Sequence, residues 1–221
     1  MFNTKTLCNR FGMEVGLELH SQMESNLIAY LEELILENKV VIFKNQNLSP
    51  IEQIQFCKQF GEIEPRPLKN NTCPYLEMTY VSNVIENGVS KGYPGPQFYI
   101  WHSDMCYEKI PPKFSFLYAE QVPDIGGNTL FANTTKAYED LNLEIKQKLE
   151  SQKAIFGFSA RLMQRYKKKG YDLIISKEDQ RLDCIHPLFR KHPITDKKSI
   201  FVNWTHTDSI IDMDPDEVHR N

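Results

Sequence analysis

A histidine and an aspartate two residues apart, His102 and Asp104, are the first candidates for chemistry in this sequence. Residues 98–101 before them are apolar or aromatic and predict a strand. Side chains at i and i+2 of a strand share a face, so an imidazole nitrogen and a carboxylate oxygen would lie side by side. Such a pair supplies two of the three ligands of the 2-His-1-carboxylate facial triad, which binds Fe(II). A bare His-x-Asp match is more often a hydrogen-bonded surface pair. The surrounding sequence therefore has to distinguish such a pair from a metal site.

The segment that follows the pair carries further motifs. Trp101-His102-Ser103-Asp104 is followed by a double proline, a Gly-Gly-Asn-Thr turn and an Ala-Tyr pair, at positions 111–112, 126–129 and 137–138. Over residues 101–141 this order resembles the taurine dioxygenase / chlorophenoxyacetate dioxygenase family of Fe(II)- and 2-oxoglutarate-dependent oxygenases. On this resemblance we interpret His102 and Asp104 as metal ligands.

The resemblance implies a fold, a cofactor and a reaction. The fold is a double-stranded β-helix (jelly roll), mainly β with flanking helices, and residues 1–221 would form a single oxygenase domain. Fe(II) would be held by His102 and Asp104, and Thr129 matches the position whose hydroxyl bonds the cosubstrate 2-oxoglutarate. The enzyme would consume dioxygen, hydroxylate a small-molecule substrate and release succinate and carbon dioxide.

Three further residues are candidate substrate contacts. Arg66 stands where the taurine enzyme of the family carries a sulfonate-contacting histidine. His206 stands at a pocket position that is a histidine in the chlorophenoxyacetate branch, and Phe158 would form an apolar wall of the pocket. Arg66 and His206 are compatible with an anionic substrate, such as a carboxylate or a sulfonate. An exposed arginine and a histidine at a strand end are equally good interpretations.

The last part of the sequence departs from the family pattern. Relatives continue through a Trp-Asp-Asn-Arg-x-x-x-His block, which supplies the second histidine ligand, and a later arginine that binds 2-oxoglutarate. Nothing after Asp104 matches that block, and the histidines that could replace it are His186, His192, His206 and His219. The resemblance therefore predicts a jelly roll incomplete at its C-terminus, whose 221 residues alone would be inactive and bind iron and 2-oxoglutarate weakly.

Two other classes of protein stay open. One is a jelly-roll binding module without catalysis, or a truncated pseudoenzyme, which the missing third ligand favours. The other is a metal-dependent hydrolase or isomerase on a similar barrel. The Gly-Gly-Asn-Thr turn argues against both, because the resemblance assigns Thr129 to 2-oxoglutarate rather than to the metal.

The composition of the sequence argues against some classes of binding partner. A formal net charge of −3 and an isoelectric point of about 6.1 give no basic field for nucleic acid or an anionic membrane. No apolar run is long enough to span a membrane, and the first residues contain no apolar signal-peptide core. The five cysteines include no C-x-x-C pair and indicate reduced thiols, so we expect a cytoplasmic protein. The oligomeric state, monomer or homo-oligomer, stays open.

Hydrophobic spacing and turn residues predict the elements around these motifs. Helices are expected over residues 21–38, over 50–60 with Ser49 as the cap, and from 133 or 134 to about 150. Strands are expected over residues 40–43, 78–84, 114–121, 129–132, 188–191 and 199–203. The basic segment 161–170 is interpreted as a solvated loop or helix face, and His186 and His192 as structural.

Overall fold

The computed structural model describes residues 2–8, 11–63, 73–92, 100–157, 159–168, 170 and 184–213. The chain divides into two compact units, Met1–Pro94 and Gly95–Asn221. His102, Asp104 and His206 all belong to the second unit. Among the described residues, no helix is long and apolar enough to cross a membrane.

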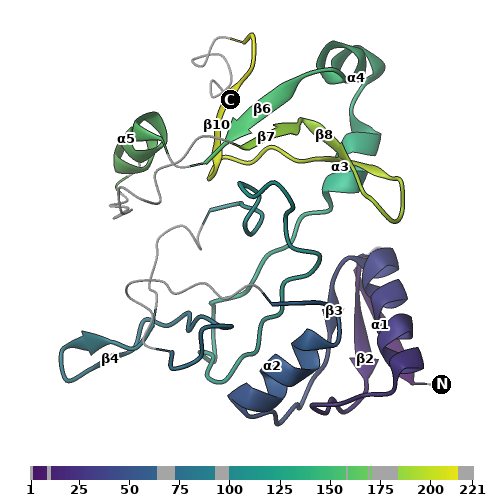
Figure 1. The fold of residues 1–221 in the computed structure, drawn as a ribbon, viewed down its shortest axis with the longest axis vertical. Helices are drawn as coiled ribbons and strands as arrows, with labels where there is room; N and C mark the ends of the chain where they lie inside the picture. The colour runs from purple at the N-terminus through teal and green to yellow at the C-terminus, as the bar shows by residue number, and fades with distance from the viewer. Residues whose placement is uncertain are drawn as a thin grey trace. The chain divides into compact units, whose positions relative to one another are not determined.

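The first unit contains a three-stranded sheet and two helices (Figure 1). β1 (Asn3–Cys8) pairs antiparallel with β2 (Phe11–Gly16), and β2 pairs parallel with β3 (Val41–Ile42). The predicted amphipathic helix is α1 (Ser25–Asn38), which begins four residues later than expected and buries Ile28, Leu31 and Leu34. The hairpin of β1 and β2 was not predicted from the sequence.

The second helix of this unit, α2 (Pro50–Lys58), confirms the predicted capping box. The Ser49 hydroxyl accepts a hydrogen bond from the Glu52 amide at 3.4 Å, and the Glu52 carboxylate accepts one from the Ser49 amide at 2.8 Å. These two bonds satisfy amides that the first turn of a helix leaves without partners. Pro50 in the first turn needs no such partner because it has no amide hydrogen.

The strand predicted over residues 78–84 is wrong. Instead, β4 (Ile85–Glu86) and β5 (Val89–Ser90) form a hairpin in which Ile85 pairs with Ser90. Asn87 and Gly88 connect them with φ angles of 51° and 77°. Asn-Gly with two positive φ angles is the preferred two-residue hairpin turn, so the turn chemistry outweighed the apolar pattern before it.

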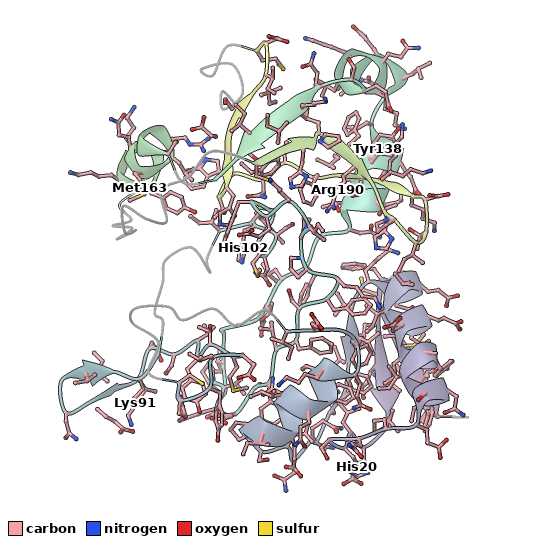
Figure 2. The ribbon with its side chains drawn as sticks, in the orientation of Figure 1. His20, Lys91, His102, Tyr138, Met163 and Arg190 are labelled. Atoms are coloured by element: carbon pink, nitrogen blue, oxygen red, sulfur yellow. The ribbon has the colours of Figure 1, made fainter. Side chains whose placement is uncertain are left out.

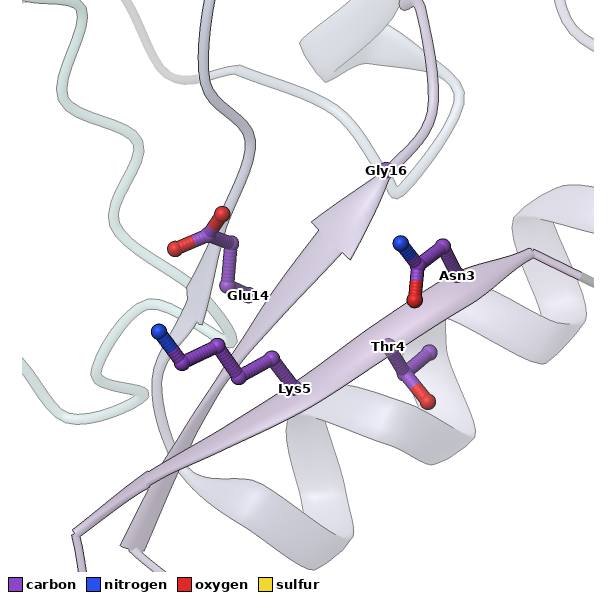
Figure 3. A pocket seen from close by; sticks show the side chains of 5 residues that line it. All are labelled: Asn3, Thr4, Lys5, Glu14 and Gly16. Atoms are coloured by element: carbon purple, nitrogen blue, oxygen red, sulfur yellow. The ribbon is translucent and has the colours of Figure 1, made fainter.

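A polar hollow lies on the hairpin of β1 and β2 (Figure 3). Its lining consists of Asn3, Thr4, Lys5, Glu14 and Gly16. Glu14 is also paired with Lys44, at 2.8 Å between carboxylate oxygen and Nζ. None of the described residues that were predicted to carry chemistry is in this lining.

The second unit is built on a sheet with the order β10–β6–β7 (Figure 1). Its central strand β6 (Lys153–Phe156) is antiparallel to both β7 (Cys184–Pro187) and β10 (Thr207–Ile210). A separate hairpin pairs β8 (Phe189–Lys191) with β9 (Lys198–Ile200), close to two of the predicted strands. The core of the unit consists of Cys106, Ala154, Phe156, Cys184, Leu188 and Phe189.

The helix predicted over residues 133–150 is two helices, α3 (Thr134–Asp140) and α4 (Leu143–Leu149). Asn133, one of the two residues predicted as the cap, caps α3 by accepting a hydrogen bond from the Lys136 amide. Asn142 caps α4 by accepting one from the Ile145 amide. An asparagine that caps a new helix ends the preceding one, which explains the break. The basic segment forms α5 (Ala160–Lys168).

Two strands predicted near the candidate site do not form ladders within the described residues. Residues 114–118 do alternate between half-buried and exposed side chains, as a strand would. Neither this segment nor residues 129–132 is paired as a strand. Alternation sets the direction of side chains, but a strand also needs a neighbour for its amides and carbonyls.

Candidate functional site

His102 lies outside any strand, in an irregular segment that leads into the turn of residues 104–107. Ile100 and Trp101 lie outside strands, which corrects the prediction for residues 98–101, of which 98 and 99 lie outside the described residues. Figure 2 labels the His102 side chain. Its Nδ1 lies 2.7 Å from the Ile100 carbonyl oxygen. Since a carbonyl only accepts hydrogen bonds, Nδ1 carries the proton of this contact. Nε2 is therefore the atom of the ring that faces Asp104.

Asp104 faces His102 with one oxygen and Ser115 with the other. Its Oδ1 lies 3.3 Å from His102 Nε2, and its Oδ2 accepts a 2.7 Å hydrogen bond from the Ser115 hydroxyl. The hydrogen bond to His102 lowers the pKa of Asp104, while desolvation opposes it and Ser115 adds to it. The same bond raises the pKa of His102. The two groups thus stabilise each other, and their other polar atoms, Nδ1 and Oδ2, are already hydrogen-bonded.

The geometry of this pair fits a divalent transition metal. First-row ions hold imidazole nitrogen and carboxylate oxygen at about 2.1 Å, so two donors at a right angle lie about 3 Å apart. The 3.3 Å between Nε2 and Oδ1 is close to that spacing. The hydrogen bonds of Nδ1 and Oδ2 are the outer partners that orient metal ligands in proteins. The Asp104 side chain is 51% exposed, which leaves room for further ligands.

A third protein ligand is not assembled within the part of the chain that the structure describes. No group of three His, Cys, Asp or Glu side chains there is arranged to hold a metal ion. The ring of His206 lies beside the pair, with its centroid 6.3 Å from that of His102 at an interplanar angle of 72°. The described residues therefore supply two donors, His102 and Asp104.

His206 is a buried neighbour of this pair. Its side chain is 6% exposed, and its ring centroid lies 5.0 Å from that of Tyr107. Burial, with a smaller contribution from neighbouring His102 and against the opposing effect of Asp104, lowers the pKa of His206 to about 4. His206 is thus neutral near pH 7, and it can offer an N–H donor to a bound molecule rather than a positive charge.

Of Thr129, Arg66, Phe158 and His219, which were also predicted to carry function, the structure describes Thr129. Thr129 is exposed and follows Gly126 and Gly127, whose φ angles of 84° and 69° make the turn that glycine favours. Arg66, Phe158 and His219 lie outside the described residues.

The two histidines interpreted as structural make local contacts. The His186 ring packs edge-on against the rings of Phe156 and Phe201, and its Nε2 is 2.8 Å from the Glu108 carbonyl oxygen. His192 Nδ1 accepts hydrogen bonds from the amides of Ile194 and Thr195 in the turn after β8. Both contacts fit the structural interpretation.

Comparison with known proteins agrees with the family resemblance of the sequence motifs. Residues 3–220 match the family described as "Taurine catabolism dioxygenase TauD, TfdA family". An alkylsulfatase of Acinetobacter baylyi is 30% identical over 211 residues, which cover 90% of this chain and 62% of the relative. A sulfonate dioxygenase of Saccharomyces cerevisiae, named as α-ketoglutarate-dependent, is 26% identical over 95% of this chain and 51% of its own length. The chain thus spans between half and two thirds of these relatives.

Solved structures show the same fold. AAD-2 in complex with Mn(II) and N-oxalylglycine superposes with a TM-score of 0.74 at 25% identity, covering 98% of this chain and 75% of AAD-2. A putative 2,4-D dioxygenase from Burkholderia xenovorans superposes with a TM-score of 0.76 at 23% identity, with the same coverage. The fold is therefore the double-stranded β-helix (jelly roll) of these dioxygenases, mainly β with flanking helices, as predicted.

Proposed function

Because the chain belongs to the taurine dioxygenase TauD, TfdA family, we propose that it is part of an Fe(II)- and 2-oxoglutarate-dependent dioxygenase. The reaction is the hydroxylation of a small anionic substrate, with succinate and carbon dioxide as products. The observation that carries the proposal is the pair of His102 Nε2 and Asp104 Oδ1, which face each other at 3.3 Å. The other polar atoms of the two side chains, His102 Nδ1 and Asp104 Oδ2, are hydrogen-bonded, as those of metal ligands usually are.

The residues of the chain bind and orient, and the bound groups supply the oxidation. Fe(II) with 2-oxoglutarate and dioxygen provides the oxidising power for hydroxylation. Asp104 brings the negative charge that balances the metal cation, and His102 brings a neutral nitrogen donor, fixed by the bond from Nδ1 to the Ile100 carbonyl. We assign Thr129 the role of a hydroxyl partner for the carboxylate of 2-oxoglutarate.

The names of the relatives support an anionic substrate. The alkylsulfatase, the sulfonate dioxygenase and a 2,4-dichlorophenoxyacetate dioxygenase of Cupriavidus pinatubonensis are named for a sulfate ester, a sulfonate and a carboxylate. In this chain, Arg66 would contribute the positive charge for such a group. His206 would contribute an N–H donor, and Phe158 an apolar wall. A single experiment tests the proposal: oxygen uptake and succinate release should both require Fe(II) and 2-oxoglutarate.

That experiment also separates the proposal from a binding module without catalysis. The complete protein, stripped of metal with a chelator, is supplied with Fe(II), 2-oxoglutarate and a panel of alkyl sulfonates, sulfate esters and aryloxy carboxylates. A dioxygenase releases one succinate per oxygen consumed, and omission of either Fe(II) or 2-oxoglutarate stops both. Binding of metal and 2-oxoglutarate without succinate in the presence of every member of the panel would instead support the binding module.

Replacement of Arg66 by alanine should raise the KM for an anionic substrate by about ten- to a hundredfold. A hydrogen bond to a charged group contributes about 1.5–3 kcal/mol, which corresponds to that range. Metal affinity should not change, because Arg66 is not a ligand in this proposal. Steady-state oxygen uptake gives the KM, and Arg66→Lys, which keeps the charge, serves as the matched control. A loss of metal affinity in Arg66→Ala would place this residue at the metal instead of the substrate.

Replacement of Ser115 by alanine should weaken metal binding by about tenfold. The Ser115 hydroxyl orients Asp104 by donating to Oδ2, and loss of such an outer partner typically costs 10–100-fold in metal affinity. Anaerobic titration with Co(II), followed by its visible absorption, measures the affinity. Ser115→Thr keeps the hydroxyl and should bind Co(II) nearly as the unaltered protein does. Equal affinity in Ser115→Ala would show that Asp104 is oriented without this bond.

A further inference from the structure

Residues 203–207, which precede and begin β10, form a turn held by its own polar side chains. The Asn203 Oδ1 accepts a hydrogen bond from the His206 amide at 2.9 Å. The Thr207 hydroxyl oxygen accepts one from the Asn203 amide at 3.0 Å, and the Thr207 amide donates to the Asn203 carbonyl at 3.2 Å. Three bonds across five residues leave this turn little freedom. We call residues 203–207 the clamp turn.

The clamp turn is also fixed from outside, by the end of β6 and by α5. The Gly157 amide donates to the His206 carbonyl at 3.0 Å. From α5, Tyr166 donates through its hydroxyl to the Thr205 carbonyl at 3.3 Å, and Arg165 donates to the Thr207 carbonyl at 2.6 Å. The turn is therefore a rigid part of the second unit rather than a free loop.

Two side chains of the clamp turn bond to residues on either side of the candidate metal ligands. The Thr205 hydroxyl donates to the Trp101 carbonyl at 2.9 Å, in the peptide that leads directly into His102. The Asn203 side-chain amide donates to the Cys106 Sγ at 3.2 Å, two residues after Asp104. Thr205 and Cys106 are both fully buried, at 0% exposure, so these bonds are shielded from water.

The segment with His102 and Asp104 needs such support. It lies outside any strand within the described residues, and Asp104 itself is half exposed. Met105, directly after Asp104, has a φ of 48°, in the left-handed region that a residue with a side chain adopts at a cost. Such a conformation persists only where its surroundings hold it.

We infer that Thr205 and Asn203 are positioning residues for the metal centre. Through Trp101 and Cys106 they fix the backbone on either side of His102 and Asp104, and so keep Nε2 and Oδ1 at the spacing that a metal ion needs. The inference rests on the proposed function, because that proposal makes this pair the metal-binding pair. It assigns Thr205 a role at the metal centre that its position 101 residues after Asp104 does not suggest.

The test compares Thr205→Val, which removes the hydroxyl and keeps the shape, with Thr205→Ser, which keeps the hydroxyl. Ser199→Ala is the matched control, because the Ser199 hydroxyl also donates to a backbone carbonyl of the second unit, that of Arg190, but away from the pair. Two properties are measured on the full chain. One is Co(II) affinity under anaerobic conditions, and the other is hydrogen exchange of the Glu108 amide, which bonds to the Met105 carbonyl at 3.0 Å.

Thr205→Val should weaken Co(II) binding about tenfold, the range seen when outer partners of metal ligands are lost. In the metal-free protein it should also speed exchange at Glu108 about tenfold, while the amides of β6 exchange as before. Thr205→Ser should restore both values, and Ser199→Ala should change neither. Unchanged exchange at Glu108, or an equal acceleration at β6 that indicates global opening, would overturn the inference.

The two proposals fail in different ways. If the unaltered protein binds no Co(II), the proposed metal centre is wrong, and hydrogen exchange at Glu108 still decides whether the clamp turn holds residues 101–108. If the unaltered protein binds Co(II) and Thr205→Val binds it equally well, the metal centre stands and the positioning role of Thr205 is wrong.

Discussion

Asp104→Ala should abolish metal binding and, in the complete protein, all oxygen uptake that depends on 2-oxoglutarate. The substitution removes the carboxylate of the candidate centre and leaves His102 as its remaining ligand within the described residues. Loss of an outer partner alone costs about 10–100-fold in metal affinity, and loss of a charged ligand should exceed that range. A divalent cation bound by neutral imidazole alone would also keep its full positive charge.

Co(II) titration of Asp104→Ala, with oxygen uptake as the second measurement, checks this result. Asp196→Ala is the matched control, because Asp196 is an exposed aspartate of the same unit, paired with Lys191 at 2.9 Å. It should bind metal and turn over as the unaltered protein does. Asp104→Asn keeps the size and the hydrogen bond with Ser115 but removes the charge, and should also fail. Full activity in Asp104→Ala would show that the metal site is elsewhere.

The sequence predicted the pair of His102 and Asp104 but not the way in which it is held. Spacing of two residues correctly indicated adjacent side chains, and the strand expected to produce that adjacency is absent over residues 100–104. The adjacency comes instead from an irregular segment in which the His102 ring bonds back to the Ile100 carbonyl, directly before the turn of residues 104–107. A periodic pattern fixes relative direction, whereas an irregular segment of this kind depends on contacts made far along the chain.

The elements that could be predicted are those whose stabilising contacts lie close together in the sequence. The capping box of Ser49 and Glu52 and the cap of Asn133 involve residues three apart, so their signals are complete in the sequence. The strands of the central sheet, β6, β7 and β10, are each four residues long, and their paired residues are 28 or more positions apart in the sequence. A segment of four residues does not specify which distant strand it will pair with. The bond from Thr205 to Trp101 could not be predicted for the same reason, because it also joins distant parts of the chain.

The core of the second unit depends on Phe156. Its side chain is fully buried in the central strand β6, and its ring centroid lies 5.5 Å from that of His186 and 5.4 Å from that of Phe201. Truncation of a fully buried phenylalanine to alanine typically costs 3–5 kcal/mol, because it loses burial and leaves a cavity. Phe156 also precedes Gly157, whose amide holds the clamp turn through the His206 carbonyl.

Phe156→Ala should therefore lower the free energy of unfolding by about 3–5 kcal/mol, and the melting temperature by about 10 °C or more. Since β6 positions the clamp turn, metal affinity should fall together with stability. Chemical denaturation followed by circular dichroism gives the free energy, and Co(II) titration of the folded fraction gives the affinity. Phe131→Ala, which truncates a phenylalanine that is 50% exposed, is the matched control and should cost about 1 kcal/mol or less. Equal losses in the two variants would show that Phe156 is not at the centre of this core.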